Sequence, residues 1–211
     1  SNSTGLRYKT LSDWNIDLSN TFGFNEFKYN VDNTVNYSLG ADSPTSFYAG
    51  KHSFLQNTIN LDFSKKINQN VNLAFGGEYR YEKYQIEAGE EDSYKGGGSQ
   101  SFVGFSPDNA VKGDRNSIAA YADLGLTFGN FTADLAGRFE NYSDFGNTFN
   151  GKLALRYEYV KGYSIRGAVS TGFRAPSLQQ KYFGNSYTDL YVNEDGTQSL
   201  VTKGIIRNSS D

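Results

Sequence analysis

The residues from Phe149 to Tyr159 alternate strictly between two kinds of side chain, and this alternation limits the possible folds more than any other feature. The odd positions are Phe149, Gly151, Leu153, Leu155, Tyr157 and Tyr159, and the even positions are Asn150, Lys152, Ala154, Arg156 and Glu158. A period of two gives a β-strand one apolar face and one polar face. After a short turn at 160–162, residues 163–169 continue the pattern. The two segments therefore predict a hairpin with one apolar face.

The same alternation recurs along most of the chain. It predicts further strands, which we place at 13–24, 27–39, 55–63, 71–81, 118–128 and 131–139. Tight reversals are expected at Asn25-Glu26, at 129–130 and at 160–162, and longer loops at 40–53 and 85–115. Short and long connections thus alternate, as they do in outer-membrane barrels with short periplasmic turns and longer extracellular loops.

The apolar positions of these strands indicate a lipid environment. None of them is Asp, Glu, Lys or Arg, and a basic residue at the middle of a bilayer costs about 2–4 kcal/mol. The strands run to about 10–13 residues, close to the length of roughly 9–11 that a tilted membrane strand needs. Aromatic residues gather at the strand ends, either as interfacial girdles or as hairpin packing pairs. These are Phe22, Phe24, Phe27, Tyr29, Phe128, Phe131, Tyr157, Tyr159 and Tyr163.

Composition excludes several classes of protein. The 211 residues carry a formal net charge of −3, whereas binding to nucleic acid requires a basic surplus. The chain has 0 cysteines, so it has no disulfides, no thiolate metal site and no cysteine nucleophile. No run of about 18 apolar residues predicts a membrane-spanning helix.

No catalytic or cofactor motif is present, so we expect neither an enzyme nor a bound cofactor. The single histidine, His52, is expected to be an exposed loop residue, and Gly96-Gly97-Gly98 a flexible loop. The acidic segments 90–92 and 193–195 could bind calcium, but their spacing does not fit an EF-hand. Asp195-Gly196 is typical of the turn of a small hairpin.

Charged residues are confined to the polar positions of the strands, which would face the interior of a barrel. The candidates for contact with the interior are Glu78, Arg80, Glu82, Arg138, Glu140, Arg156 and Arg166. A wide barrel holds either water or a plug. These side chains are therefore expected to form ion pairs along a wet wall, or to contact a plug domain or a substrate.

The chain leaves the last hairpin through Gly172-Phe173-Arg174-Ala175-Pro176-Ser177-Leu178. Pro176 cannot donate to a strand ladder, so regular pairing should stop near it. This heptapeptide, together with the hairpin before it, resembles a segment of TonB-dependent outer-membrane receptors. The resemblance extends more loosely to residues 76–84 and 115–124. The resemblance gives Arg174 no chemical role that follows from the sequence.

The resemblance implies that residues 1–211 are a segment of a large transmembrane β-barrel in the outer membrane of a Gram-negative bacterium. Such a barrel has roughly 22 strands around a plug, and this chain would supply about eight of them, without the plug. The implied function is active import of a scarce nutrient, either an iron chelate such as a siderophore, cobalamin or a glycan. The implied partners are outer-membrane lipid, that nutrient and, through the plug, the TonB-ExbB-ExbD system.

Two other classes of protein share part of this pattern. A passive porin or a small barrel anchor would show the same alternation, and only the 172–178 segment and the missing ends argue against it. A soluble β-sandwich that binds carbohydrate or mediates adhesion would have shorter strands and two sheets packed face to face.

Overall fold

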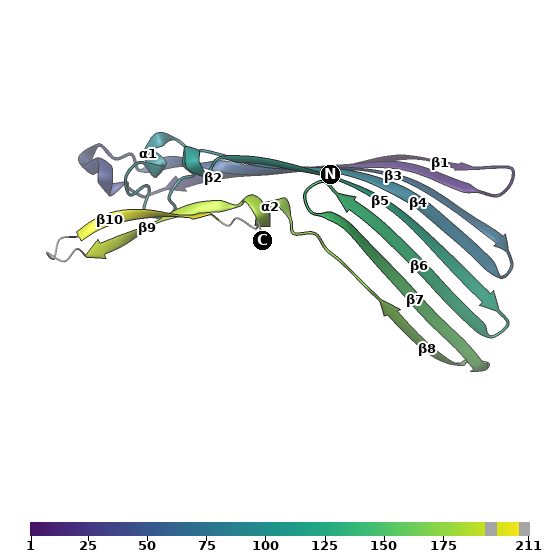
Figure 1. Cartoon of the computed structure of the whole chain (residues 1–211). Helices are drawn as coiled ribbons and strands as arrows, with labels where there is room; N and C mark the ends of the chain where they lie inside the picture. Colours follow the sequence, from purple (N-terminus) through teal and green to yellow (C-terminus); the bar gives the residue numbers. More distant parts are fainter. Residues whose placement is uncertain (193–197, 207–211) are drawn as a thin grey trace. The chain divides into compact units, whose positions relative to one another are not determined.

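The computed structural model describes residues 1–192 and 198–206, and most of them lie in one antiparallel sheet of eight strands (Figure 1). The strands are β1 Asn2–Lys9, β2 Asn15–Asp32, β3 Ser46–Asn68, β4 Val71–Glu87, β5 Val111–Phe128, β6 Phe131–Tyr142, β7 Gly146–Val160 and β8 Tyr163–Ser170. A second sheet pairs β9 Gly184–Val192 with β10 Gln198–Ile206. The short helices are η1 Tyr37–Asp42, α1 Glu91–Tyr94, η2 Pro107–Asn109 and α2 Leu178–Tyr182. No helix among the described residues is long and apolar enough to cross a bilayer.

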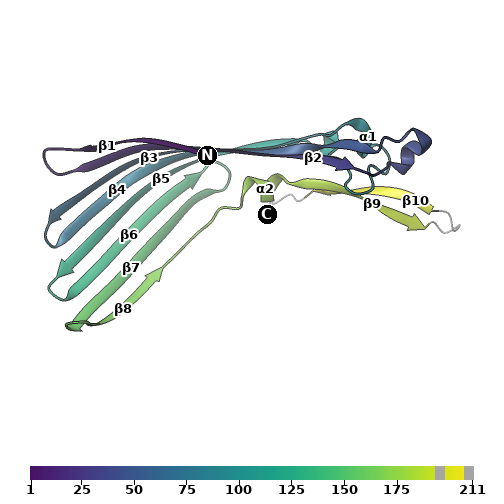
Figure 2. The ribbon, with the colours of Figure 1, turned by 180° about the vertical axis from the view of Figure 1, so that it is seen from behind.

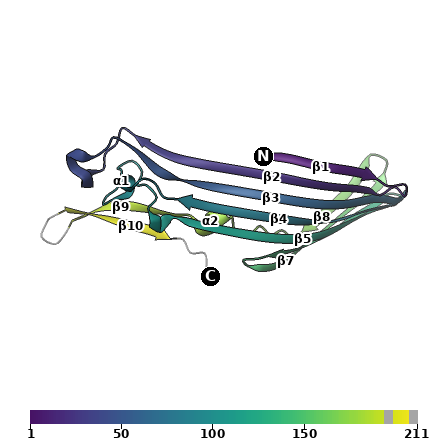
Figure 3. The same ribbon diagram turned by 90° about the horizontal axis from the view of Figure 1, so that it is seen from above.

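Each strand of the large sheet pairs with the next one along the chain, in the order β1 to β8. The sheet is open, with β1 and β8 as its two edge strands, and β1 to β5 lie side by side in Figure 3. The predicted all-β antiparallel meander is therefore confirmed. The turn that would join β9 and β10, predicted at Asp195-Gly196, lies outside the described residues.

Four short connections join β1 to β2, β3 to β4, β5 to β6 and β7 to β8 (Figure 2). The predicted reversals at 129–130 and 160–162 are two of them. Gly129 has φ +59° and Gly162 has φ +88°, a backbone region that glycine adopts without steric cost. The other connections are longer and span 33–45 and 88–110, apart from the short loop between β6 and β7.

The predicted reversal at Asn25-Glu26 is wrong, because β2 runs without interruption from Asn15 to Asp32. The first turn lies instead at 10–14, where Thr10 N donates to Trp14 O at 2.8 Å. Residues 2–9, which show no strand pattern in the sequence, form β1.

The chain divides into two compact units, and this division explains the misplaced turn. Unit 1 comprises residues 1–23, 56–81 and 115–175, and unit 2 comprises 24–55, 82–114 and 176–211. The apolar positions of β2 change from even to odd numbers where the strand passes from unit 1 to unit 2. A change of parity can mark a hairpin, but here it marks a strand whose two halves have different surroundings.

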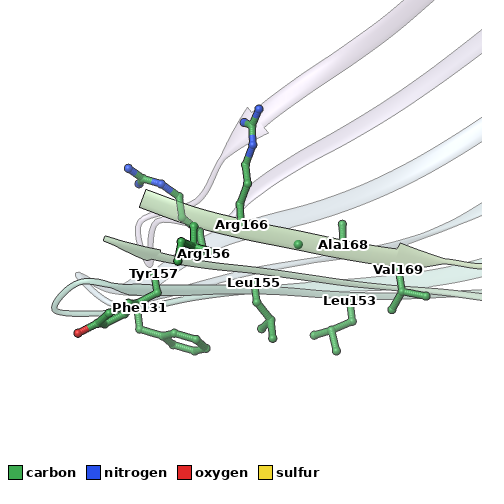
Figure 4. A pocket seen from close by; sticks show the side chains of 10 residues that line it. Phe131, Leu153, Leu155, Arg156, Tyr157, Arg166, Ala168 and Val169 are labelled. Atoms are coloured by element: carbon green, nitrogen blue, oxygen red, sulfur yellow. The ribbon is translucent and has the colours of Figure 1, made fainter. Parts of the chain in front are cut away.

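Unit 1 has one face without charge, apart from Lys65 near the β3–β4 turn, and one face with charge. Lys65 Nζ lies 5.6 Å from the centroid of the Trp14 ring. Cross-strand pairs on the uncharged face include Phe131 with Tyr157, Leu135 with Leu153 and Phe139 with Phe149. Most of the large apolar side chains on this face are exposed. The exposed ones include Phe128, Phe131, Leu135, Phe139, Phe149, Leu155, Tyr157 and Ile165. Figure 4 shows Leu153, Leu155 and Val169 on one side of the strands and Arg156 and Arg166 on the other. An exposed apolar face of this extent indicates a lipid or protein neighbour.

Two polar side chains on the uncharged face of unit 1 form a hydrogen bond with each other. Asn20 on β2 and Asn57 on β3 both occupy apolar positions of their strands, and Asn20 Nδ2 donates to Asn57 Oδ1 at 2.6 Å. In hydrocarbon an amide without a partner costs several kcal/mol. The hydrogen bond removes most of this cost, so the pair is compatible with a lipid-facing surface.

We expect Leu155→Arg to destabilise the full-length protein in lipid by about 2–4 kcal/mol, because it places a charge on the uncharged face. The matched control is Ala154→Arg, one residue away on the charged face, which should cost much less. Equilibrium unfolding from lipid vesicles would measure both. Equal losses of stability would show that the uncharged face does not meet lipid.

Candidate functional site

The charged face of unit 1 carries a network of ion pairs. Glu78 Oε1 lies 2.8 Å from Arg80 Nη2 and 3.2 Å from Arg138 Nη2. Arg138 also pairs with Glu140 at 2.8 Å, and the Tyr142 hydroxyl donates to Glu140 Oε2 at 3.1 Å. The structure thus brings together four of the seven sequence-predicted interior residues. Glu78 and Arg80 lie on β4, Arg138 and Glu140 lie on β6, and the pair of Glu78 with Arg138 spans the intervening strand β5.

The other three predicted residues lie elsewhere. Glu82 is buried in unit 2, Arg156 pairs with Glu158 at 3.0 Å, and Arg166 is exposed on β8. The placement of these charges fits a wet interior wall. Contact of any of them with a plug or substrate stays a prediction.

Unit 2 also has two dissimilar faces. On one, Lys51 Nζ lies 3.3 Å from Glu26 Oε2 and 3.2 Å from Glu87 Oε1, so one ammonium bridges three strands. Glu26 also pairs with Lys28. The basic partners lower the pKa of Glu26, and Glu87 and Glu26 raise the pKa of Lys51. The even positions of β2, which are uncharged up to Phe24, therefore become charged in unit 2, as expected for a surface that has left the apolar layer.

The opposite face of unit 2 is an aromatic cluster. Its buried centre is formed by Tyr84, Ile86, Phe105 and Leu178. Around this centre pack Tyr29, Phe54, Phe102, Val111, Tyr182 and Phe183. The Tyr29 and Phe102 rings stack with centroids 5.0 Å apart. The cluster draws its residues from four strands, β2 to β5, from the 88–110 loop and from the segment around α2, and so holds these elements together.

His52 belongs to this cluster, and its assignment to an exposed loop is wrong. It lies within β3 and is only partly exposed. Tyr29 Oη lies 3.2 Å from His52 Nδ1, within hydrogen-bond distance. The rings of Phe27 and Tyr29 lie 5.2 and 5.6 Å from the imidazole. A place for these two residues in an interfacial girdle stays a prediction. Burial lowers the pKa of His52 because it disfavours the imidazolium.

Tyr84 brings a second polar atom into the cluster. Its side chain is 1% exposed, and its hydroxyl has no hydrogen-bond partner in the part of the chain that the structure describes. Burial, with a smaller contribution from Tyr29, raises the pKa of Tyr84 to about 12. Burial among apolar rings therefore favours the neutral forms of the Tyr84 phenol and the His52 imidazole.

The loops 33–45 and 88–110 are joined by side-chain hydrogen bonds. Asn36 is fully buried, and its Nδ2 donates to the carbonyl oxygens of Asp92 and Lys95, each at 2.8 Å. Gly97 N donates to Ser38 Oγ at 2.8 Å. The triglycine 96–98 forms a turn in which Gly96 and Gly98 have positive φ, and a Cβ at Gly96 would collide with Ser38. The flexibility of this segment stays a prediction.

The heptapeptide 172–178 acts as an anchored strap. Phe173 packs on Phe145 with ring centroids 5.3 Å apart, within unit 1. Leu178 is fully buried in the aromatic cluster of unit 2. Between these two apolar anchors the chain has no regular structure, and Arg174 is exposed. At the end of the strap the Ser177 and Gln180 side chains cap α2 reciprocally.

An open meander of long strands, with one uncharged face and one face of ion pairs, defines the wall of an outer-membrane β-barrel. The family described as "TonB dependent receptor-like, beta-barrel" matches residues 1–202. The chain belongs to this family, and its location is the outer membrane of a Gram-negative bacterium. The resemblance found in the sequence is thereby confirmed.

Individual relatives match the chain over part of their length. The vitamin B12 transporter BtuB of Vibrio cholerae serotype O1 is 25% identical over 75 residues, or 34% of this chain and 12% of the transporter. The crystal structure of the siderophore receptor PirA from Acinetobacter baumannii has a TM-score of 0.57 and 13% identity, over 93% of this chain and 28% of that receptor. The second likeness shows the fold alone. The chain therefore spans a small part of each relative.

Sequence reasoning missed the aromatic cluster. The residues Tyr84, Ile86 and Phe105 lie beyond the strand that the alternation predicts at 71–81, so the periodicity gives them no partners. One signal was present: the polar positions of β4 carry Glu78 and Arg80, then become aromatic or aliphatic at Tyr84 and Ile86. This change shows that the face they share becomes a core.

We expect Leu178→Ala to destabilise unit 2 by about 2–5 kcal/mol, because it empties a fully buried site. Hydrogen exchange of the full-length protein should show lost protection at Tyr84 and Ile86. Gln179→Ala, at the exposed next position, is the control and should stay within about 0.5 kcal/mol of the parent. Unchanged protection in Leu178→Ala would contradict the role of the strap as an anchor.

Unit 2 should lose stability in mild acid. The unfolded chain binds a proton at His52 near pH 6.5, whereas the folded pKa is lower. The contribution of neutral His52 to the stability of unit 2 is therefore fully present above about pH 6.5. It is lost as the pH falls through the lower pKa of His52 in the folded protein. Limited proteolysis of loop 88–110 at about pH 7.5 and 5.5 would measure this. The difference should shrink in His52→Phe; an unchanged difference would assign the acid sensitivity to other groups.

Proposed function

We propose that the full-length protein is an active importer that takes up a scarce small nutrient with energy delivered through TonB. Residues 1–211 form about eight strands of its barrel. The plug domain and the remaining strands lie outside this sequence. The proposal rests on family membership together with the short share of each relative that the chain covers.

The observation that carries this proposal is the contrast between the two faces of one open sheet. The uncharged face suits lipid, and the opposite face holds the ion pairs among Glu78, Arg80, Arg138 and Glu140. A β-sandwich would need its apolar face covered by a second sheet. Instead, large side chains on that face are exposed in unit 1.

The nutrient belongs to one of three classes, namely an iron chelate such as a siderophore, cobalamin or a glycan. The two named relatives are a vitamin B12 transporter and a siderophore receptor, which favours the first two classes. The rigid pair of loops joined through Asn36 would form part of the extracellular rim. A binding role rather than an enzymatic one agrees with the absence of a catalytic constellation in the sequence.

The decisive experiment measures uptake in paired host strains that contain or lack TonB. Cells that express the full-length protein should take up one of labelled cobalamin, ferric siderophore or oligosaccharide only when TonB is present. Cells without the protein are the control. Equal uptake with and without TonB would identify a passive pore, and no uptake of any of these classes would refute the proposed substrate range.

A further inference from the structure

Two arginines stand directly opposite each other on the charged face of unit 1. The register of β7 and β8 pairs Arg156 with Arg166, next to the pair Glu158 with Ser164. Side chains opposite each other in an antiparallel pair have Cβ atoms about 4.5–5.5 Å apart, and like charges at such positions destabilise the sheet. A matching anion nearby would remove this cost.

The side chains that the structure describes, in residues 1–184, supply one of the two carboxylates that the pair needs. Glu158 Oε2 lies 3.0 Å from Arg156 Nη2, and Glu158 Oε1 also accepts a hydrogen bond from Gly162 N at 3.2 Å. Within residues 1–184, whose side chains the structure describes, no carboxylate oxygen lies within 4.0 Å of the Arg166 guanidinium. Glu158 is thus already ion-paired with Arg156 and hydrogen-bonded to the β7–β8 turn.

The space in front of the arginines is open. A recess of about 430 Å³ is lined by Thr132, Asp134, Ala154, Arg156, Arg166 and Ala168. Figure 4 shows Arg156, Arg166 and Ala168 on the same side of the strands, away from Leu155 and Val169. The alanines leave room beside the guanidinium groups, where larger side chains would fill the recess. Asp134 lines the recess but forms no ion pair with either arginine among the described residues.

We propose that Arg166, with Arg156 beside it, receives a carboxylate from a part of the same protein that lies outside residues 1–211. A guanidinium presents a planar fork of donors that matches a carboxylate in a bidentate pair. The proposal rests on the proposed function, since that function supplies the missing strands and plug. The inference deepens that function by naming the contact through which the charged face of residues 1–211 binds the rest of the protein.

The carboxylate has two possible sources with the same chemistry. β8 is an edge strand, so a further strand paired with it would place a side chain directly beside Arg166. Alternatively, an acidic segment of the plug would enter the recess from the interior of the barrel. Both sources predict one contact, and the position of the carboxylate along the chain distinguishes them.

Carbodiimide coupling of the full-length Arg166→Lys protein in detergent tests the proposal. The carbodiimide activates a carboxylate as an O-acylisourea; the lysine amine attacks its carbonyl carbon, loses a proton and expels a urea, which leaves an amide cross-link. Peptide mass mapping then identifies the acidic partner. Ser164→Lys is the matched control on the same face of β8, because Ser164 is the register partner of Glu158. Coupling there to Glu158 shows that the chemistry works on this face.

We expect the amine of Arg166→Lys to couple to an Asp or Glu outside residues 1–211, in a strand that follows β8 or in the plug. Coupling only to Glu158 or Asp134 would overturn the proposal, as would no coupling at 166 while the control couples. Replacing the identified acid by its amide should abolish the product. The uptake assay is independent: a cross-link without uptake refutes import alone, and uptake without a cross-link refutes this contact alone.

Discussion

The cost of placing charge and unpaired polar groups in hydrocarbon governs this structure. A basic side chain at the middle of a bilayer costs about 2–4 kcal/mol, comparable to a large part of the total stability of a typical domain. The uncharged face of unit 1 follows directly from this cost. Because strand side chains alternate, charges away from the turns are then directed to the opposite face, where Glu78, Arg80, Arg138 and Glu140 neutralise one another.

The change at the boundary between the two units follows from the same constraint. In unit 2 the positions of β2 that are apolar up to Phe24 carry Glu26 and Lys28, and the alternate positions carry aromatic rings such as Tyr29. Water now covers the face that hydrocarbon covered before, so the apolar side chains gather on the other face and are covered by the loop residues Phe102 and Phe105. One continuous strand, β2, therefore has a part suited to hydrocarbon and a part suited to water.

The sequence predicted what depends on local periodicity. The strand that contains Ala154 and Leu155, its two faces and the turns at Gly129 and Gly162 were all predicted correctly, because side-chain alternation and turn glycines are local signals. The false turn at Asn25-Glu26 arose because a change of solvent along a strand produces the same change of parity as a hairpin. The contacts of His52 could not be predicted, since they join residues that lie more than 20 positions apart.

The hydrogen bond between Asn20 and Asn57 has a consequence for how this surface can change over evolutionary time. Loss of either amide leaves the other without its partner in hydrocarbon, whereas replacement of both by apolar residues of similar size would be nearly neutral. Single changes at either position would therefore cost more stability than the paired change. A stepwise exchange of the pair for apolar residues would pass through a less stable intermediate, whichever amide is lost first.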